Sequence, residues 1–252
     1  MKMSHHDCLD KTLNERTNEH DACLKVIDTR IGEDLEMLLY DAGRPNPRAV
    51  RMFLLEKGVT IPVQDIDVDG GENRRLPYTN DNPAGQVPAL RLDDGTCLAE
   101  TGAIFQYIDE IFPEKTLIGV TAQARAETRM WQRRIELGIT EHLYAAFHYG
   151  KAAEMYRTRM RILPEAVSGL IALTHDGLNW LDQQMIGRSF IVPDRLTIVD
   201  IILYCAVDFG SRVGQAIDPE LATVGSWFAR MAERPSAVTS LHPTAKSAGM
   251  RL

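Results

Sequence analysis

Two short stretches of this chain carry residues that could act on a bound molecule. Residues 82–90 read Asn-Pro-Ala-Gly-Gln-Val-Pro-Ala-Leu, and the pair Glu100–Thr101 follows them. Pro88 stands in a short apolar run, where a proline cannot donate a hydrogen bond to a neighbouring strand. The backbone at Val87 therefore faces either a peptide-like ligand or solvent at a sheet edge. From the residues alone, the solvent-facing edge is the simpler interpretation.

The elements around these stretches predict a small α/β domain over residues 35–113. Residues 35–40 predict a buried strand, Arg48 to Lys57 a helix capped by Gly58, and Ile66 with Val68 a second strand. A strand–helix–strand crossover is expected to be parallel.

A hairpin and a helix complete this domain. Residues 87–92 and 96–98 predict two strands joined at Asp93-Asp94-Gly95, which is a strong hairpin signal. Ile104, Ile108 and Ile111 recur at helical spacing, and the helix ends before Pro113. The order is thus β-α-β followed by β-β-α.

From residue 120 to 243 the strand signals disappear, and the sequence predicts an all-helical domain. We expect helices over residues 122–149, with Met130, Ile135 and Leu137 among the apolar positions, over 164–185 and over 219–234. A further helix begins at Thr197, where Asp200 stands three residues later as a capping box; we expect this pair to stabilise the fold. Residues 1–34 are polar and predict a poorly ordered extension.

Composition excludes several function classes. The net charge is −7, with no block of Lys and Arg, so a nucleic-acid partner is not expected. No apolar run reaches the length of a membrane helix. The four cysteines show no metal-binding spacing, which favours reduced thiols in a cytoplasmic protein and no metal site.

Taken together, these motifs resemble the cytosolic glutathione transferases. The resemblance rests on Asn-Pro-x-Gly-Gln-Val-Pro and Glu-Thr in an α/β domain, followed by Thr-x-x-Asp in an all-helical domain, and it spans about residues 35–240. Residues 39–58 look most like the fungal and bacterial theta-like subgroup. The family implies a thioredoxin-like N-terminal domain, then a C-terminal helical bundle, with glutathione as co-substrate.

The resemblance also assigns ligand-binding roles. A cis bond before Pro88 would turn the Val87 backbone outward, to pair with the cysteinyl backbone of glutathione. Thr101, at a helix N-terminus, would take the γ-glutamyl carboxylate, and Glu100 would compensate its ammonium. Gln86 could contact the same end. The glycyl carboxylate needs a cation, and Arg44, Arg74 or Arg75 could supply it.

The group that activates the thiol stays open, because residues 40–50 hold no serine or cysteine. The absence weakens the cysteine-dependent alternatives, among them maleylacetoacetate isomerase. Asn46 is the first choice, as a hydrogen-bond donor to the thiolate. Arg44 would lower the thiol pKa by its charge. Tyr40 is the tyrosine-type alternative, although a core position explains it better.

A fourth route is a water molecule held by the helix that carries His142, Tyr144 and His148. The electrophile pocket is expected between the loop after Tyr40 and residues 144–149, and its apolar lining suits a hydrophobic electrophile. The resemblance implies a homodimer. The alternatives are a non-catalytic binding protein of the same fold and a glutathione-dependent dehalogenase or etherase.

Overall fold

The computed structural model describes residues 37–243, so the extension predicted over residues 1–34 lies outside the described part. The chain separates into two units, residues 1–37 and 38–252. Every helix and strand named below belongs to the second unit.

A four-stranded sheet organises the first half of this unit. Its strands are β1 (Leu38–Asp41), β2 (Val63–Asp65), β3 (Ala89–Arg91) and β4 (Cys97–Ala99), in the order β2-β1-β3-β4. β1 and β2 are parallel, while β3 pairs antiparallel with both β1 and β4. The parallel crossover and the hairpin are both confirmed.

The position of the second strand was predicted wrongly. β2 covers Val63–Asp65, three exposed residues at the sheet edge, whereas Ile66 and Val68 follow it. Ile66 and Val68 are buried in a cluster with Tyr40, Ala42, Tyr78 and Ala89. The apolar alternation thus marks residues that pack into the core after the strand has ended.

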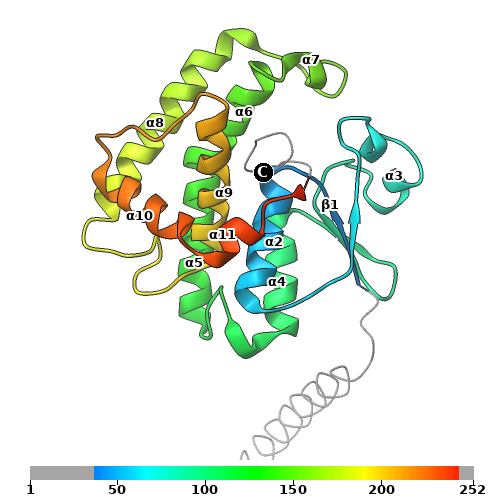
Figure 1. The fold of residues 1–252 in the computed structure, drawn as a ribbon, viewed down its shortest axis with the longest axis horizontal. Coiled ribbons are helices and arrows are strands. Elements are labelled where there is room, and N and C mark those ends of the chain that lie inside the picture. Colours follow the sequence, from blue (N-terminus) through cyan, green and yellow to red (C-terminus); the bar gives the residue numbers. More distant parts are fainter. Residues whose placement is uncertain (1–36, 244–252) are drawn as a thin grey trace, which may run out of the picture. The chain divides into compact units, whose positions relative to one another are not determined.

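Helices α2 (Pro45–Lys57) and α4 (Thr101–Ile111) accompany the sheet, with a 3-10 turn at Glu72–Arg74 and a short helix α3 (Tyr78–Asp81). Gly58 ends α2 in the left-handed conformation, with φ +74°, as expected for a C-cap glycine. Figure 1 shows α2 and α4 between the sheet and the helices of the second half.

The second half is helical, as predicted. Its helices are α5 (Ala122–Ile135), α6 (Glu141–Tyr149), α7 (Ala153–Tyr156), α8 (Val167–Gln184), α9 (Ile198–Arg212), α10 (Ala222–Ala232) and α11 (Pro235–Thr239), with 3-10 turns at Pro113–Lys115 and Pro164–Ala166. A π-helical segment, Glu136–Thr140, joins α5 to α6, so the helix predicted over residues 122–149 is continuous. Of the three residues predicted on its apolar face, Ile135 is buried, whereas Met130 and Leu137 are 42% and 49% exposed.

The capping box at the start of α9 is confirmed. The Thr197 side chain accepts from the Val199 N–H, and Asp200 accepts from the Thr197 N–H at 3.0 Å. Buried Asp200 also accepts from the Ile191 N–H at 2.9 Å and from Trp227 Nε1 at 3.0 Å. The carboxylate is therefore fully hydrogen-bonded, and it ties α9 to α10 and to the preceding loop.

Two ion pairs, one buried and one partly buried, join the two halves. Arg48 on α2 donates to Asp208 on α9 at 2.6 Å, and both side chains are almost fully buried. Glu56 near the end of α2 accepts from Arg234 Nε at 2.7 Å and from the Ser236 hydroxyl. Within the described residues, no helix is long and apolar enough to cross a membrane.

Candidate functional site

A cleft of about 480 Å³ lies where the loop before α2 faces α6. It is lined by Arg44, Pro45, Asn46, Pro47, Val68, Asn73, Arg74, Gln86, Val87, Glu100, Glu141, Tyr144, Ala145, His148, Tyr149, Tyr156, Arg159 and Met160. The structure thus brings together two groups of predicted residues, the peptide-binding loop and the thiol-activating candidates. The loop after Tyr40 and residues 144–149 form its walls, as predicted for the electrophile pocket.

A second cavity of about 750 Å³ adjoins the cleft and contains Thr101. Four residues line both spaces: Asn46, Glu100, Glu141 and Tyr144. Thr101 therefore lies beyond this shared boundary, at the end of the site predicted to take the γ-glutamyl group.

The backbone at Val87 is open to the cleft. The Val87–Pro88 bond is cis, in agreement with the resemblance, and Leu76–Pro77 is a second cis bond that was not predicted. Within residues 37–243, neither the N–H nor the C=O of Val87 has a hydrogen-bond partner. Both groups can therefore pair with a peptide-like ligand, while Pro88 itself is buried.

The loop that presents Val87 is held from behind. The carbonyl of Gln86 accepts from Asn82 Nδ2 at 2.8 Å and from the Tyr78 hydroxyl. Asn73 Nδ2 donates to the Gly85 carbonyl at 2.6 Å. Gly85 has φ +60°, and a Cβ there would lie 2.6 Å from the Asn73 carbonyl oxygen, so this position requires glycine.

Glu100 stands at the N-terminus of α4 in an unusual conformation. Its φ of +70° lies in the left-handed region, which costs a residue with a Cβ on the order of 1–3 kcal/mol. Its carbonyl accepts from the N–H groups of Ala103 and Ile104, both at 3.0 Å. The geometry places an exposed carboxylate beside both cavities and leaves the first N–H groups of α4 for a ligand.

Tyr40 is a core residue, which confirms the core position preferred for it from the sequence. Its hydroxyl donates to Asp81, and its ring packs edge-on against Tyr78 at 5.2 Å between centroids. Burial, with a further contribution from Asp81, raises the pKa of Tyr40 to about 12. The hydroxyl does not line the cleft.

Asn46 is the second residue of α2, and its side chain is exposed in both cavities. Its amide has no hydrogen-bond partner within the described residues. Arg44 lies next to it, but its guanidinium already pairs with Asp69 and donates to the Gly43 carbonyl at 2.9 Å. Of the two, Asn46 has the donor that is free to meet a ligand.

Two of the three candidates on the facing helix line the cleft, namely Tyr144 and His148. His148 stacks on Tyr156 at 4.1 Å between ring centroids, and burial lowers its pKa to about 4. Burial raises the pKa of Tyr144, so its hydroxyl keeps the proton. His142 instead places Nδ1 3.3 Å from the Gly138 carbonyl oxygen and does not line the cleft.

The structure separates the arginines proposed for the glycyl carboxylate. Arg74 lines the cleft and donates to the Ala84 carbonyl at 3.0 Å, whereas Arg75 bonds the carbonyls of Gly70 and Gly71 and lies outside it. Arg159, which sequence reasoning missed, also lines the cleft. It follows α7 in an irregular segment that has no periodic signal.

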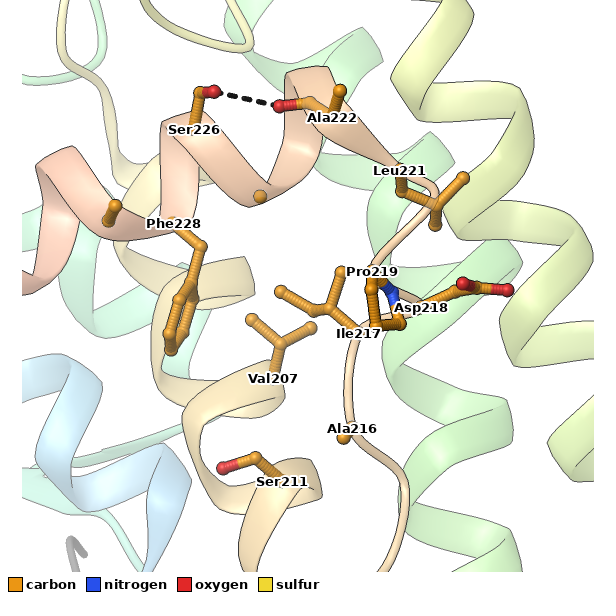
Figure 2. A pocket seen from close by; sticks show the side chains of 12 residues that line it. Val207, Ser211, Ala216, Ile217, Asp218, Pro219, Leu221, Ala222, Ser226 and Phe228 are labelled. Carbon is orange, nitrogen blue, oxygen red and sulfur yellow. Dashed lines mark hydrogen bonds between the residues drawn. The ribbon is translucent and has the colours of Figure 1, made fainter.

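Two other features lie apart from the cleft. Asp41, Asp65 and His242 have ligand atoms within 4.8 Å of one another. Arg51 pairs with Asp41, and His242 Nε2 lies 2.9 Å from Asp65, so these groups already satisfy each other. A hollow of about 620 Å³ between α9 and α10 has a largely apolar lining that includes Val207, Ile217 and Phe228 (Figure 2).

Comparisons with known proteins identify the family of this chain. Residues 35–110 match the glutathione S-transferase N-terminal domain, and residues 174–235 match the C-terminal domain. The chain is 29% identical over 220 residues to glutathione S-transferase 2 of Saccharomyces cerevisiae, covering 84% of this chain and 92% of that protein. It is 40% identical over 172 residues to maleylacetoacetate isomerase of Pseudomonas aeruginosa, covering 67% and 78%.

A solved structure that is similar to this chain in sequence also has the same fold. The glutathione S-transferase domain-containing protein of Marinobacter aquaeolei is 33% identical, with a TM-score of 0.75, and the match covers 79% of this chain and 98% of that one. The thioredoxin-like α/β part followed by a helical part is therefore confirmed. The chain belongs to the glutathione S-transferase family.

Proposed function

We propose that this protein is a glutathione transferase that stabilises the glutathione thiolate and conjugates it to an electrophile or uses it to reduce a peroxide. The observation that carries the proposal is the cleft itself. It joins an unpaired backbone at Val87, a carboxylate at Glu100 and a free amide at Asn46 in one space. Similarity to proteins named as glutathione S-transferases supports the same conclusion.

Each end of glutathione has a partner in this arrangement. The Val87 N–H and C=O pair with the cysteinyl backbone, next to Gln86 and Pro88. Thr101 and the first N–H groups of α4 take the γ-glutamyl carboxylate, and Glu100 takes the ammonium. Arg74 takes the glycyl carboxylate, because it lines the cleft and Arg75 does not.

Asn46 is our first choice for stabilising the thiolate. A free thiol has a pKa near 8.5, so the enzyme must favour the charged form at neutral pH. The Asn46 amide can donate to sulfur without giving up another bond, whereas Arg44 acts through its charge while it stays paired with Asp69. His148 is neutral at that pH and contributes as a hydrogen-bonding group near the sulfur.

The test is the thiol pKa of bound glutathione, which is measured from the ultraviolet absorbance of the thiolate as the pH is varied. Because a hydrogen bond to a charged group contributes about 1.5–3 kcal/mol, Asn46→Ala should raise the thiol pKa by about one unit or more. Asn46→Asp, which keeps the shape and adds a negative charge, should raise it further. Asn80→Ala, at an exposed asparagine on α3, should leave it unchanged.

Three outcomes would count against parts of the proposal. Absence of glutathione binding would remove the whole assignment. Glutathione binding without turnover of aryl halides, epoxides or hydroperoxides would favour the alternative, a non-catalytic binding protein of this fold. An unchanged thiol pKa in Asn46→Ala would transfer the activating role to Arg44 or to the His148 helix.

One specific observation favours the alternative of a non-catalytic binding protein. Residues 40–50 hold no serine or cysteine, and the one tyrosine there, Tyr40, donates its hydroxyl to Asp81. For the same reason we do not carry over the isomerase activity of the Pseudomonas relative. A glutathione-dependent dehalogenase or etherase would use the same site and differ only in the electrophile. By family likeness, we infer a homodimer that acts in the cytoplasm.

A further inference from the structure

Arg159 extends the positive charge of the cleft beyond what glutathione needs. Arg74 and Arg159 both line the cleft, and neither forms an ion pair within residues 37–243. Burial lowers the pKa of Arg74, and the charge of Arg159 lowers it further, so the two guanidinium groups repel each other. Bound anions would relieve this repulsion. Glutathione offers only one carboxylate at this end, its glycyl group.

The charges of the cleft are divided between its two ends. The acidic residues Glu100 and Glu141 line the boundary shared with the second cavity, whereas Arg44, Arg74 and Arg159 line the cleft alone. Arg44 is already paired with Asp69. With the glycyl carboxylate on Arg74, Arg159 is left as a guanidinium that faces the space of the second substrate.

The surroundings of Arg159 are aromatic. Its Cζ lies 5.5 Å from the centre of the Tyr156 ring, and Tyr156 stacks on His148. Nη2 of Arg159 donates to the Val68 carbonyl at 3.1 Å. This hydrogen bond holds the guanidinium in place in the cleft. A planar ring lying along Tyr156 and His148 would thus bring an attached anionic group to the remaining N–H donors of Arg159.

We propose that Arg159 makes this enzyme selective for aromatic electrophiles that carry a carboxylate. This inference rests on the proposed function, and it names the class of second substrate. The neighbouring Arg157 offers a matched control, because it is exposed and paired with Glu154 on its own helical turn.

The test uses 4-chloro-3-nitrobenzoate and its neutral analogue, 4-chloro-3-nitrobenzamide. In both reactions the thiolate sulfur bonds to the ring carbon, chloride leaves, and the thiol proton has gone to solvent. Comparing each variant with wild type on the same electrophile removes the difference in intrinsic reactivity.

Arg159→Met should lower kcat/KM for the benzoate by about tenfold, the loss expected for one hydrogen bond to a charged group. It should leave kcat/KM for the benzamide and KM for glutathione within about twofold. Arg159→Lys, which keeps the charge but loses the planar fork, should lie between wild type and Arg159→Met. Arg157→Met should behave as wild type with both electrophiles.

Two results would overturn the inference. One is an equal loss with benzoate and benzamide, which would give Arg159 a structural role. The other is a raised KM for glutathione that disappears when the glycyl carboxylate is blocked as its ethyl ester, which would place Arg159 on glutathione.

A binding measurement keeps the inference separate from catalysis. Calorimetry with the two synthetic conjugates should show that wild type binds the carboxylate form about tenfold tighter than the carboxamide form, and that Arg159→Met does not discriminate. If wild type binds glutathione but turns over neither these two electrophiles nor epoxides and hydroperoxides, the proposed function fails, and this titration still decides the anion site. Equal binding of the two conjugates by wild type would overturn the inference that Arg159 selects for a carboxylate.

Discussion

His148 shows how burial changes what one side chain can contribute to the cleft. The ring is stacked on Tyr156 and half-buried, and burial lowers its pKa to about 4 because the imidazolium loses its water. At physiological pH it is therefore a neutral group that can accept or donate a hydrogen bond. It supplies no positive charge for a thiolate, in contrast to an arginine.

This depressed pKa predicts a stability that depends on pH. The unfolded chain, with a histidine pKa of about 6.5, takes up the proton before the folded chain does as the pH falls. The contribution of neutral His148 is therefore complete above about pH 6.5 and is lost as the pH falls toward about 4. By about pH 5 the loss should reach up to about 2 kcal/mol.

Urea unfolding of wild type and His148→Phe at about pH 7.5 and about pH 5 measures this effect. Phenylalanine keeps the stack on Tyr156 without a titrating group. The variant should lose less stability than wild type between the two pH values. The same loss in both proteins would contradict the assigned pKa.

At the scale of elements, the position of α6 depends on how α8 packs against the π-helical segment. A Cβ on Gly177 of α8 would lie 2.2 Å from the Gly138 carbonyl oxygen and 2.8 Å from Ile139 Cγ1. Both contacts are too short for any side chain. The absence of a side chain at Gly177 thus lets α8 reach the backbone of the segment that leads into Tyr144 and His148.

Gly177→Ala should therefore destabilise the protein by about 2–3 kcal/mol, because backbone on both sides must shift. It should also reduce turnover, since α6 carries one wall of the cleft. Gly169→Ala on the same helix is the matched control, because a Cβ there meets nothing within 4 Å. That change should stabilise by about 0.5–1 kcal/mol.

Thermal or urea unfolding, with turnover measured on the same preparations, distinguishes the two variants. Equal stability of Gly177→Ala and Gly169→Ala would show that the close approach of Gly177 to the Gly138 backbone does not affect the free energy of unfolding.

At the scale of the whole molecule, buried charges join the α/β part to the helical part. Arg48 is fully buried, donates to Asp208 at 2.6 Å, and also donates to the Ala237 carbonyl at 3.0 Å. Removing one partner of such a pair leaves the other charge buried without compensation. We therefore expect the two parts to unfold together in wild type.

Arg48→Met should lower the free energy of unfolding by about 3–5 kcal/mol. Tryptophan fluorescence reports on the helical part, where Trp131, Trp180 and Trp227 lie, and circular dichroism reports on the whole unit. The two probes should give coincident transitions in wild type. Arg157→Met, at an exposed pair, should leave the midpoint unchanged, and separate transitions in wild type would contradict the coupling.

Much of this fold could be predicted because local signals agree with tertiary structure. The capping box at Thr197, the C-cap at Gly58 and the hairpin at Gly95 each follow from short-range hydrogen bonding or backbone sterics. Likewise, the walls of the cleft follow from the turn residues before α2 and the aromatic stretch on α6. These features need no information from distant residues.

The remainder depends on packing that the sequence pattern does not report. β2 is an exposed edge strand, so its three residues carry no apolar alternation. The π-helical segment forms its hydrogen bonds between residues five apart, one residue further than the α-helical spacing that a pattern search assumes. Arg159 reaches the cleft from an irregular segment, and only the hydrogen bond to Val68 reveals its position.

The π-helical segment has a consequence for how this cleft can change in evolution. One extra residue in a helical turn rotates everything after it by about 100° relative to an uninterrupted α-helix. The segment therefore sets the angular phase of α6 separately from that of α5. If the segment became a regular α-helix at its present length, Tyr144 and His148 would turn away from the cleft while α5 kept its place. The extra residue between α5 and α6 therefore keeps Tyr144 and His148 facing the cleft only because this segment is π-helical.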